Sequence, residues 1–373
     1  ALCTDNLSAD LDITLPGEYF NTVLWTGSGI ARSITGVGFQ TDMWWCKNRE
    51  SSTENHTLQD AVRGATNQIY PNATSREDPN QTQGLLTFDS DGFSIGTDNS
   101  CNESGNTIVA WDWKAGGGPT TDNVEAAGAT PTAGSVKIDG SNLGSALAGT
   151  IAATRLSANT TSGFSIVKYT GTGSLATVAH GLSQAPELII VKQIPTSSNW
   201  AVGATPVYSG WTGRAGELNS TGAKSSSSDY WDDTPPSPSV FTIGTELNVN
   251  ESGDELIAYI FHSVEGYSKV GSYEGNGNLD GTFVYTAFRP AFVMTKSVDS
   301  TSDWQMFDNK RTGYNVDNYE LEANDLAAED TSTEFIDIVS NGFKNRDTTD
   351  PNVAETYIYL AFAESPFKYS NAR

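Results

Sequence analysis

The stretch Leu24-Trp25-Thr26-Gly27-Ser28-Gly29 recurs twice more along the chain, and this repetition decides the fold. It returns as Lys168-Tyr169-Thr170-Gly171-Thr172-Gly173 and as Ser272-Tyr273-Glu274-Gly275-Asn276-Gly277. Each time an aromatic residue ends an apolar segment and a Gly-x-Gly follows. Glycine tolerates positive φ, so the pattern predicts a strand that runs into a hairpin turn. Self-similarity at a fixed spacing is the signature of a repeat architecture.

Further blocks recur in the same order around this stretch. Each copy has a lysine at the end of an apolar segment, at positions Lys47, Lys192 and Lys296. Two copies contain Asn-Glu-Ser-Gly, beginning at Asn102 and Asn250. Each copy closes on a β-branched and aromatic segment, at residues 108–113, 256–261 and 357–362. The order of these blocks predicts three copies of one module.

Each copy has the pattern of a β-structure. Phe20–Thr26 alternates apolar and polar positions, as a half-buried strand does. The closing segments are rich in residues that favour strands and are predicted to be central strands. The fold class is therefore all-β, with three tandem β-sandwich domains of jelly-roll-like type from an internal repeat.

The repeats set the expected domain boundaries. Residues 119–162 are rich in Gly, Ala, Thr and Ser, and are expected to form a partly ordered connector. The expected parts are an N-terminal lead-in at 1–17, sandwich repeat 1 at 18–118, the connector at 119–162, sandwich repeat 2 at 163–265 and sandwich repeat 3 at 266–373.

Composition restricts the function classes. The 373 residues carry a formal charge of −24, which argues against nucleic acid as a partner. No apolar run approaches the roughly 18 residues that a membrane helix needs, so no membrane insertion is expected. The cysteines Cys3, Cys46 and Cys101 are odd in number, which excludes a complete disulfide framework and leaves open whether Cys46 and Cys101 pair.

Catalytic motifs are missing from the sequence. The histidines His56, His180 and His262 occupy different places in the repeats without ligand or triad spacing, and surface or turn roles are expected for them. Asp89-Ser90-Asp91-Gly92 resembles the opening of a calcium loop without the later ligands, so a turn between strands is the preferred interpretation. We therefore predict no catalytic residue, no cofactor and no metal site, and expect that the chain is not an enzyme.

The repeated polar residues allow two interpretations. Lys47, Lys192 and Lys296 could contact a ligand, or could end an edge-proximal strand whose apolar surface each lysine stem covers. The second interpretation is preferred, because repeats keep what the fold requires. Asn102 and Asn250 are interpreted in the same way, as turn residues.

Four aromatic residues lie outside the repeated blocks. Trp211 and Trp231, with Tyr208 and Tyr230, occupy a segment rich in Ser, Gly and Asp. Rigid aromatic side chains on polar loops suit sugar stacking or protein docking. They are the candidate ligand or receptor contacts.

Several longer blocks together resemble an uncharacterised tandem β-domain family of marine bacteriophage virion proteins. The blocks are Phe20-Asn21-Thr22-Val23-Leu24-Trp25-Thr26-Gly27, Gly36-Val37-Gly38-Phe39-Gln40, Phe88-Asp89-Ser90-Asp91-Gly92-Phe93, Val109-Ala110-Trp111-Asp112-Trp113-Lys114-Ala115-Gly116-Gly117, residues 135–147 and the end Ala361-Phe362-Ala363-Glu364-Ser365-Pro366-Phe367-Lys368-Tyr369. Residues 1–7 also resemble the join that follows a SPRY- or lectin-like domain in such proteins. Thr41, where proline is common, departs from the pattern. The resemblance brings no catalytic residue with it.

The resemblance implies a non-catalytic virion structural protein, a tail or tail-fibre component that displays host-binding surface. The alternatives are a capsid decoration or head-fibre protein and a carbohydrate-binding module. The implied partners are other virion proteins and copies of the chain itself, with a trimer favoured. A host surface glycan or protein is a further partner of this kind. The implied location is the surface of the virion, after assembly in the host cytoplasm.

Overall fold

The computed structural model describes residues 11, 13–311, 315 and 319–366. In them the chain is nearly all β-structure in packed sheets without a closed barrel, which confirms the predicted all-β sandwich-type fold. The join at residues 1–7, Cys3 and the end of the chain from Phe367 lie outside the described residues. The helices in the described residues are single turns: η2 (Pro16–Glu18), α1 (Asn99–Asn102), α2 (Ser228–Trp231) and α3 (Leu247–Asn250). Over the same ranges no helix is long and apolar enough to cross a membrane.

The first sandwich contains a four-stranded sheet of order β1-β7-β3-β4 and a three-stranded sheet of order β2-β6-β5. Trp25, Trp44 and Phe93 fill the space between the two sheets. Its strands are β1 (Phe20–Thr26), β2 (Arg32–Thr35), β3 (Met43–Asn48), β4 (Thr57–Asp60), β5 (Leu85–Asp89), β6 (Gly92–Ile95) and β7 (Thr107–Trp113).

The second sandwich has the largest sheet, of order β16-β14-β13-β19-β11-β10-β8-β9, opposite the pair β12-β18. The expected connector provides β8, β9 and β10 to this sheet, and its Val136 and Leu156 enter the core of the second sandwich. The strands are β8 (Val136–Ile138), β9 (Ser141–Asn142), β10 (Ala153–Asn159), β11 (Phe164–Thr170), β12 (Ala176–Ala179), β13 (Leu188–Gln193), β14 (Ala201–Ala204), β15 (Gly213–Arg214), β16 (Gly216–Glu217), β17 (Ser225–Ser226), β18 (Val240–Ile243) and β19 (Glu255–Phe261).

The third sandwich repeats the plan of the first. Its sheets have the orders β20-β27-β22-β23-β24 and β21-β26-β25, with Tyr273, Phe307 and Phe343 between them. Its strands are β20 (Ser268–Glu274), β21 (Phe283–Tyr285), β22 (Phe288–Ser297), β23 (Gln305–Asp308), β24 (Leu321–Glu322), β25 (Ile336–Val339), β26 (Gly342–Asn345) and β27 (Thr356–Pro366). The closing strands β7, β19 and β27 each lie inside a sheet, which confirms that prediction.

The predicted hairpin at the Gly-x-Gly motif is wrong. β1 pairs with β7 and β2 pairs with β6, so the motif carries the chain from the larger sheet to the smaller one. A Cβ on Gly27 would lie 2.0 Å from the carbonyl oxygen of Glu103, so only glycine allows this close approach. The corresponding distances are 2.2 Å at Gly171 and 1.9 Å at Gly275. The glycines therefore allow the segment that crosses between the two sheets to pack against the backbone just before the closing strand of each copy.

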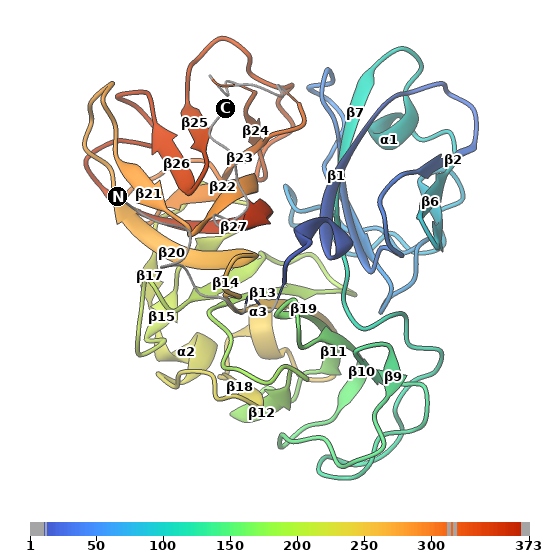
Figure 1. Cartoon of the computed structure of the whole chain (residues 1–373). Helices are drawn as coiled ribbons and strands as arrows, with labels where there is room; N and C mark the ends of the chain where they lie inside the picture. The colour runs from blue at the N-terminus through green and yellow to red at the C-terminus, as the bar shows by residue number, and fades with distance from the viewer. Residues whose placement is uncertain (1–10, 12, 312–314, 316–318, 367–373) are drawn as a thin grey trace.

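The larger sheets also bury their outer faces. Along β7, Ile108 and Ala110 face the core of their own sandwich, whereas Trp111 and Trp113 belong to a separate central core. Phe261 of β19 and Phe362 of β27 join the same core, with ring centroids 6.0 Å apart. Figure 1 shows the three sandwiches as lobes around a common centre, blue to cyan, green to yellow, and orange to red.

Hydrogen bonds between repeats close this arrangement into a ring. A loop of each repeat donates a backbone N–H to the strand end of a neighbour, always in the same sense. The bonds are Glu77 N–H to Ile194 O (2.9 Å), Lys224 N–H to Val298 O (2.9 Å) and Glu329 N–H to Arg49 O (2.8 Å). Because the third repeat donates back to the first, the chain has the cyclic geometry of a closed trimer within a single polypeptide.

Candidate functional site

The predicted aromatic contacts are mostly interior residues. Trp211 and Trp231 are each 1 % exposed, and their rings meet edge to face with centroids 5.4 Å apart. The Trp211 indole N–H donates to Thr205 Oγ1 at 3.1 Å. A Cβ on Gly203 would lie 2.3 Å from the Trp211 ring, so this glycine leaves the space that the ring fills. The premise of exposed tryptophans is therefore wrong.

The two tyrosines do not complete an open platform either. Tyr230 is 8 % exposed, and the Arg214 guanidinium lies over its ring, 5.9 Å from the centroid. Burial raises the pKa of Tyr230. Tyr208 is half-buried, and its carbonyl accepts the backbone N–H of Trp211 at 2.8 Å. The four residues thus support the second sandwich and do not present a flat aromatic surface.

All three histidines are buried, so the surface part of the expected surface or turn roles is wrong. His56 and His180 are fully buried, and His262 is 3 % exposed. Burial lowers the pKa of His180 to about 4, while its Nδ1 accepts the Leu182 N–H at 3.1 Å in a turn. His56 Nδ1 accepts the Trp45 indole N–H at 3.0 Å, and burial lowers its pKa well below the usual value. Both rings are neutral structural groups.

His56 occupies the position in the first repeat that Trp200 and Trp304 occupy in the second and third repeats. Trp200 donates its indole N–H to Tyr70 O and Ala73 O of the first repeat, each at 3.1 Å, and Trp304 donates to Glu217 O of the second at 3.0 Å. An asparagine side chain accepts the backbone N–H at all three positions. These bonds are His56 to Asn72 (3.0 Å), Trp200 to Asn219 (2.8 Å) and Trp304 to Asn324 (2.7 Å).

The repeated lysines are buried on strands inside the sheets, and the strand of Lys47 lies next to the edge strand β4. Lys47, Lys192 and Lys296 are each fully buried, on strands that have neighbours on both sides. The Lys192 ammonium donates to Gln193 O at 2.8 Å and to Ser198 Oγ at 3.0 Å. Lys47 donates to Asn48 O and Ser51 O at 2.9 and 2.7 Å. Each lysine thus holds the loop after its strand, which agrees with the preferred structural interpretation.

The repeated asparagines accept hydrogen bonds from the backbone of the Gly-x-Gly segment. Asn102 Oδ1 accepts the Ser28 N–H at 2.9 Å, and Asn250 Oδ1 accepts the Thr172 N–H at 2.7 Å. Asn352 takes this position in the third repeat and accepts the Asn276 N–H at 3.1 Å. The turn role expected for Asn102 and Asn250 is therefore confirmed at the level of contacts.

The suspected calcium loop is a turn between β5 and β6. Asp89 and Gly92 are paired across it. Asp91 Oδ1 accepts the Gly38 N–H at 2.7 Å, and Asp89 accepts the hydroxyls of Thr87 and Ser94, both at 2.9 Å. In the described ranges no three His, Cys, Asp or Glu side chains are grouped to hold a metal ion. Cys46 and Cys101 are both free and buried.

Sequence reasoning missed the polar groups at the repeat boundaries. Arg63 Nε and Asp60 Oδ2 form a buried ion pair at 2.7 Å, and the Tyr259 hydroxyl of the second repeat donates to the same oxygen at 2.7 Å. In the third repeat Arg311 and Asp308 pair at 2.6 Å, and Asp308 accepts the Trp111 indole N–H at 3.0 Å. The signal was present as Asp-x-x-Arg at 60–63 and 308–311.

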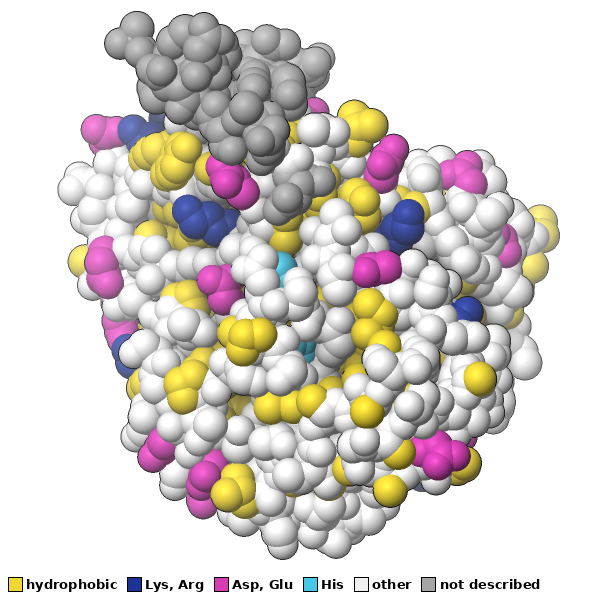
Figure 2. Space-filling model, turned by 60° about the horizontal axis from the view of Figure 1, so that its bottom comes forward, with side chains coloured by type: hydrophobic (Ala, Val, Ile, Leu, Met, Phe, Trp, Pro, Cys, Tyr) yellow, Lys and Arg dark blue, Asp and Glu magenta, His cyan; other side chains and the backbone are white. Residues whose placement is uncertain are grey.

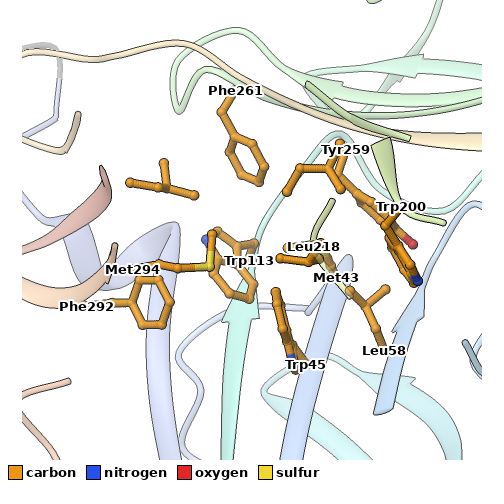
Figure 3. Close-up of a pocket in the computed structure, with 12 residues that line it drawn as sticks. Met43, Trp45, Leu58, Trp113, Trp200, Leu218, Tyr259, Phe261, Phe292 and Met294 are labelled. Atoms are coloured by element: carbon orange, nitrogen blue, oxygen red, sulfur yellow. The ribbon is translucent and has the colours of Figure 1, made fainter. Parts of the chain in front are cut away.

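A small enclosed cavity lies where the three outer faces meet. Its volume is about 20 Å³, and its exposed lining is wholly apolar. Figure 3 shows Trp45 and Trp113 of the first sandwich, Phe261 of the second and Met294 of the third pointing toward one another. A cavity of this size holds about one water-sized sphere and offers no polar partner. It is therefore a packing defect of the core.

On the face drawn in Figure 2 the charged side chains lie singly. Figure 2 shows Lys and Arg scattered among Asp and Glu, with uncharged side chains between them and no patch of one sign on that face. Two open polar hollows lie at the boundary between the first two sandwiches. One lies beside Tyr19 and Lys114, with a volume of about 440 Å³, and the other beside Ser183 and His262, with about 560 Å³.

Comparisons with known proteins found one match. No curated protein and no solved structure matched this chain. A family described as "Domain of unknown function (DUF7483)" matches residues 15–366, which span all three sandwiches. The chain therefore belongs to the DUF7483 family.

Proposed function

We propose that this chain is a non-catalytic structural protein of a bacteriophage particle, a tail or tail-fibre component that displays binding surface to the host. The observation that carries the proposal is the closed ring, in which three sandwiches share one central core. Hydrogen bonds run in one sense from repeat to repeat and return to the first. Such a body holds its outer loops at fixed relative positions, as a display protein requires.

The buried polar groups support a structural role. Lys192, Asn250 and His180 all direct their polar atoms to backbone or side-chain groups of the fold. A catalytic acid, base or nucleophile must reach a substrate from a cleft. The groups with shifted pKa values at these positions serve loops and turns instead.

Charge and the sequence resemblance support the location. A net charge of −24 favours solubility and repulsion between copies, and salt shortens the range of that repulsion. The resemblance to marine bacteriophage virion proteins is the only support for the particle itself. The proposed partners are other virion proteins and further copies of this chain, on the particle surface.

Mass spectrometry of density-purified phage particles tests the proposal. The chain is expected in the particles at a fixed ratio to the major capsid protein, and retained after a high-salt wash. Immunogold labelling then separates the tail from the head, where label would favour a capsid decoration or head-fibre protein. Recovery of the chain only from the particle-free supernatant contradicts the proposal.

A further inference from the structure

Two polar hollows flank the turn at residues 160–163, between β10 and β11. The first is lined by Tyr19, Gln40, Asp42, Lys114, Asp139 and Thr161. The second is lined by Thr160, Thr161, Ser183, Gln184, His262 and Glu265. Thr161 borders both, so together they form one groove across the boundary of the first two sandwiches. Volumes of about 440 and 560 Å³ are of the size that small-molecule sites have.

The first hollow contains a buried acceptor without a partner. Asp42 is 2 % exposed, and its Oδ2 accepts the N–H groups of Ala115 and Gly117 at 2.8 and 3.1 Å. Its Oδ1 is buried and accepts no hydrogen bond from the chain. A buried acceptor left without a hydrogen bond is unfavourable, so a donor from outside the chain is favoured there.

The second hollow contains another such acceptor. His262 is 3 % exposed, and its Nδ1 lies 2.9 Å from the carbonyl oxygen of Ser263. A carbonyl only accepts, so Nδ1 carries the proton and Nε2 is the acceptor of the neutral ring. Nε2 is buried and has no partner in the chain. Each hollow therefore lacks one hydrogen-bond donor.

The turn between the hollows is rigid. Asn159 Oδ1 accepts the N–H groups of Thr161 and Ser162 at 3.1 and 2.9 Å. Asp139 accepts the Thr160 N–H at 2.7 Å. Thr161 is thus held in place as the ridge that both hollows share.

The charge of the groove restricts the ligand. Asp42, Asp139 and Glu265 line it with one cation, Lys114, whose ammonium lies 5.4 Å from the centre of the Tyr19 ring. An excess of carboxylates disfavours phosphate, sulfate or carboxylate ligands. The rest of the lining includes hydroxyls and amides, such as Thr160, Ser183 and Gln184, which pair with groups that both donate and accept.

We propose that the groove binds a neutral oligosaccharide, with one sugar hydroxyl donating to Asp42 Oδ1 and a hydroxyl of a later sugar donating to His262 Nε2. Thr161 lies between the two subsites. The inference rests on the proposed display of host-binding surface, to which it adds a site and a class of ligand. Sugars carry a hydroxyl on most carbons, which matches a groove that offers acceptors on both sides of a ridge.

NMR titration of the full ¹⁵N-labelled chain tests the site. The probes are maltotetraose, cellotetraose, laminaritetraose and xylotetraose at millimolar concentration. At least one is expected to shift the amide signals of Gly117 and Ser263 together and to saturate. If none of the four shifts both signals, the hollows hold water only and the proposal is overturned.

Two variants that alter one acceptor each test the contacts. Asp42→Asn places a donor where Oδ1 accepts, and His262→Asn keeps a group near Nδ1 but removes Nε2. Each is expected to weaken binding about tenfold, equivalent to about 1.4 kcal/mol. Asp232→Asn, at an exposed carboxylate away from the groove, is the matched control and should bind like the unaltered chain. Unchanged affinity in both groove variants, with unchanged folding, also overturns the proposal.

The two proposals fail separately. If the chain is present in phage particles but binds none of the four probes, the virion role stands and the groove proposal is wrong. If it binds a probe but is absent from particles, the virion role is wrong and the groove belongs to a free carbohydrate-binding protein.

Discussion

The hydroxyl of Tyr259 in the second repeat donates to Asp60 Oδ2 in the first at 2.7 Å, the same oxygen that Arg63 contacts. Trp111 of the first repeat contacts Asp308 of the third in the same way, at 3.0 Å. At the remaining boundary the corresponding residues are Leu360, Ala204 and Val207, which all pack at the central core. A polar donor thus meets an ion pair at two boundaries, whereas apolar residues meet at the third, so the three boundaries are not equivalent.

Tyr259→Phe is expected to destabilise the chain by about 1–3 kcal/mol, because it removes a donor to a buried carboxylate. Tyr285→Phe is the control, since Tyr285 is 48 % exposed, and should change stability by less than about 0.5 kcal/mol. Urea unfolding measures both. Equal effects of the two variants would contradict a role for Tyr259 at the boundary.

Asp308→Ala is expected to cost about 3 kcal/mol or more, because it leaves the buried Arg311 guanidinium without its nearest carboxylate. The double variant Asp308→Ala/Arg311→Val copies Ala204 and Val207 of the second repeat. It should be more stable than Asp308→Ala alone, since the Arg311 guanidinium is no longer left buried without Asp308. The comparison comes from urea unfolding of both variants and of Arg311→Val. A double variant that loses the sum of the two single losses would refute this account.

The buried lysines should make stability rise with pH. Burial lowers the pKa of Lys192 to about 7 and that of Lys47 to about 8, below the usual 10.5. Between these values and 10.5 the unfolded chain binds more protons than the folded one, so the free energy of unfolding increases as pH rises. Lys192→Met should reduce this slope by up to about 1.4 kcal/mol per pH unit between pH 7 and 10.5. Lys168→Met, on a partly exposed ion pair, should leave the slope unchanged when unfolding is measured across that range.

Trp231→Ala should destabilise the second sandwich by about 3–5 kcal/mol, because it empties a fully buried site beside Trp211. Tyr208→Ala, at a half-buried position, should cost less. Thermal unfolding followed by circular dichroism distinguishes them. A Trp231→Ala variant as stable as the unaltered chain would restore the idea that this ring serves a ligand.

The repeats and closing strands could be predicted because their signals are local. Alternation in Phe20–Thr26 and the repeated blocks identify strands without any knowledge of their partners. The apolar residues at 108–113 also indicated that both faces of this strand are buried. Val109, Trp111 and Trp113 lie in the central core, on the face opposite to Ile108 and Ala110. A strand that is apolar on both faces must be covered twice.

The site residues could not be predicted in the same way. Trp211 lies in a polar segment, and its burial depends on the space left by Gly203 on another strand. The groove depends on Asp42 and His262, which are distant in sequence and meet the same turn only in the folded chain. Burial and missing partners are tertiary properties, so the sequence predicted surface or turn roles for histidines that the fold buries.

Cryo-electron microscopy of intact phage particles tests the virion assignment most directly. The account predicts density of three lobes around one centre on the tail surface, with the side chains of Trp111, Trp200 and Trp304 resolved at the repeat boundaries. Particles whose tail and head densities are fully explained by other chains would contradict it.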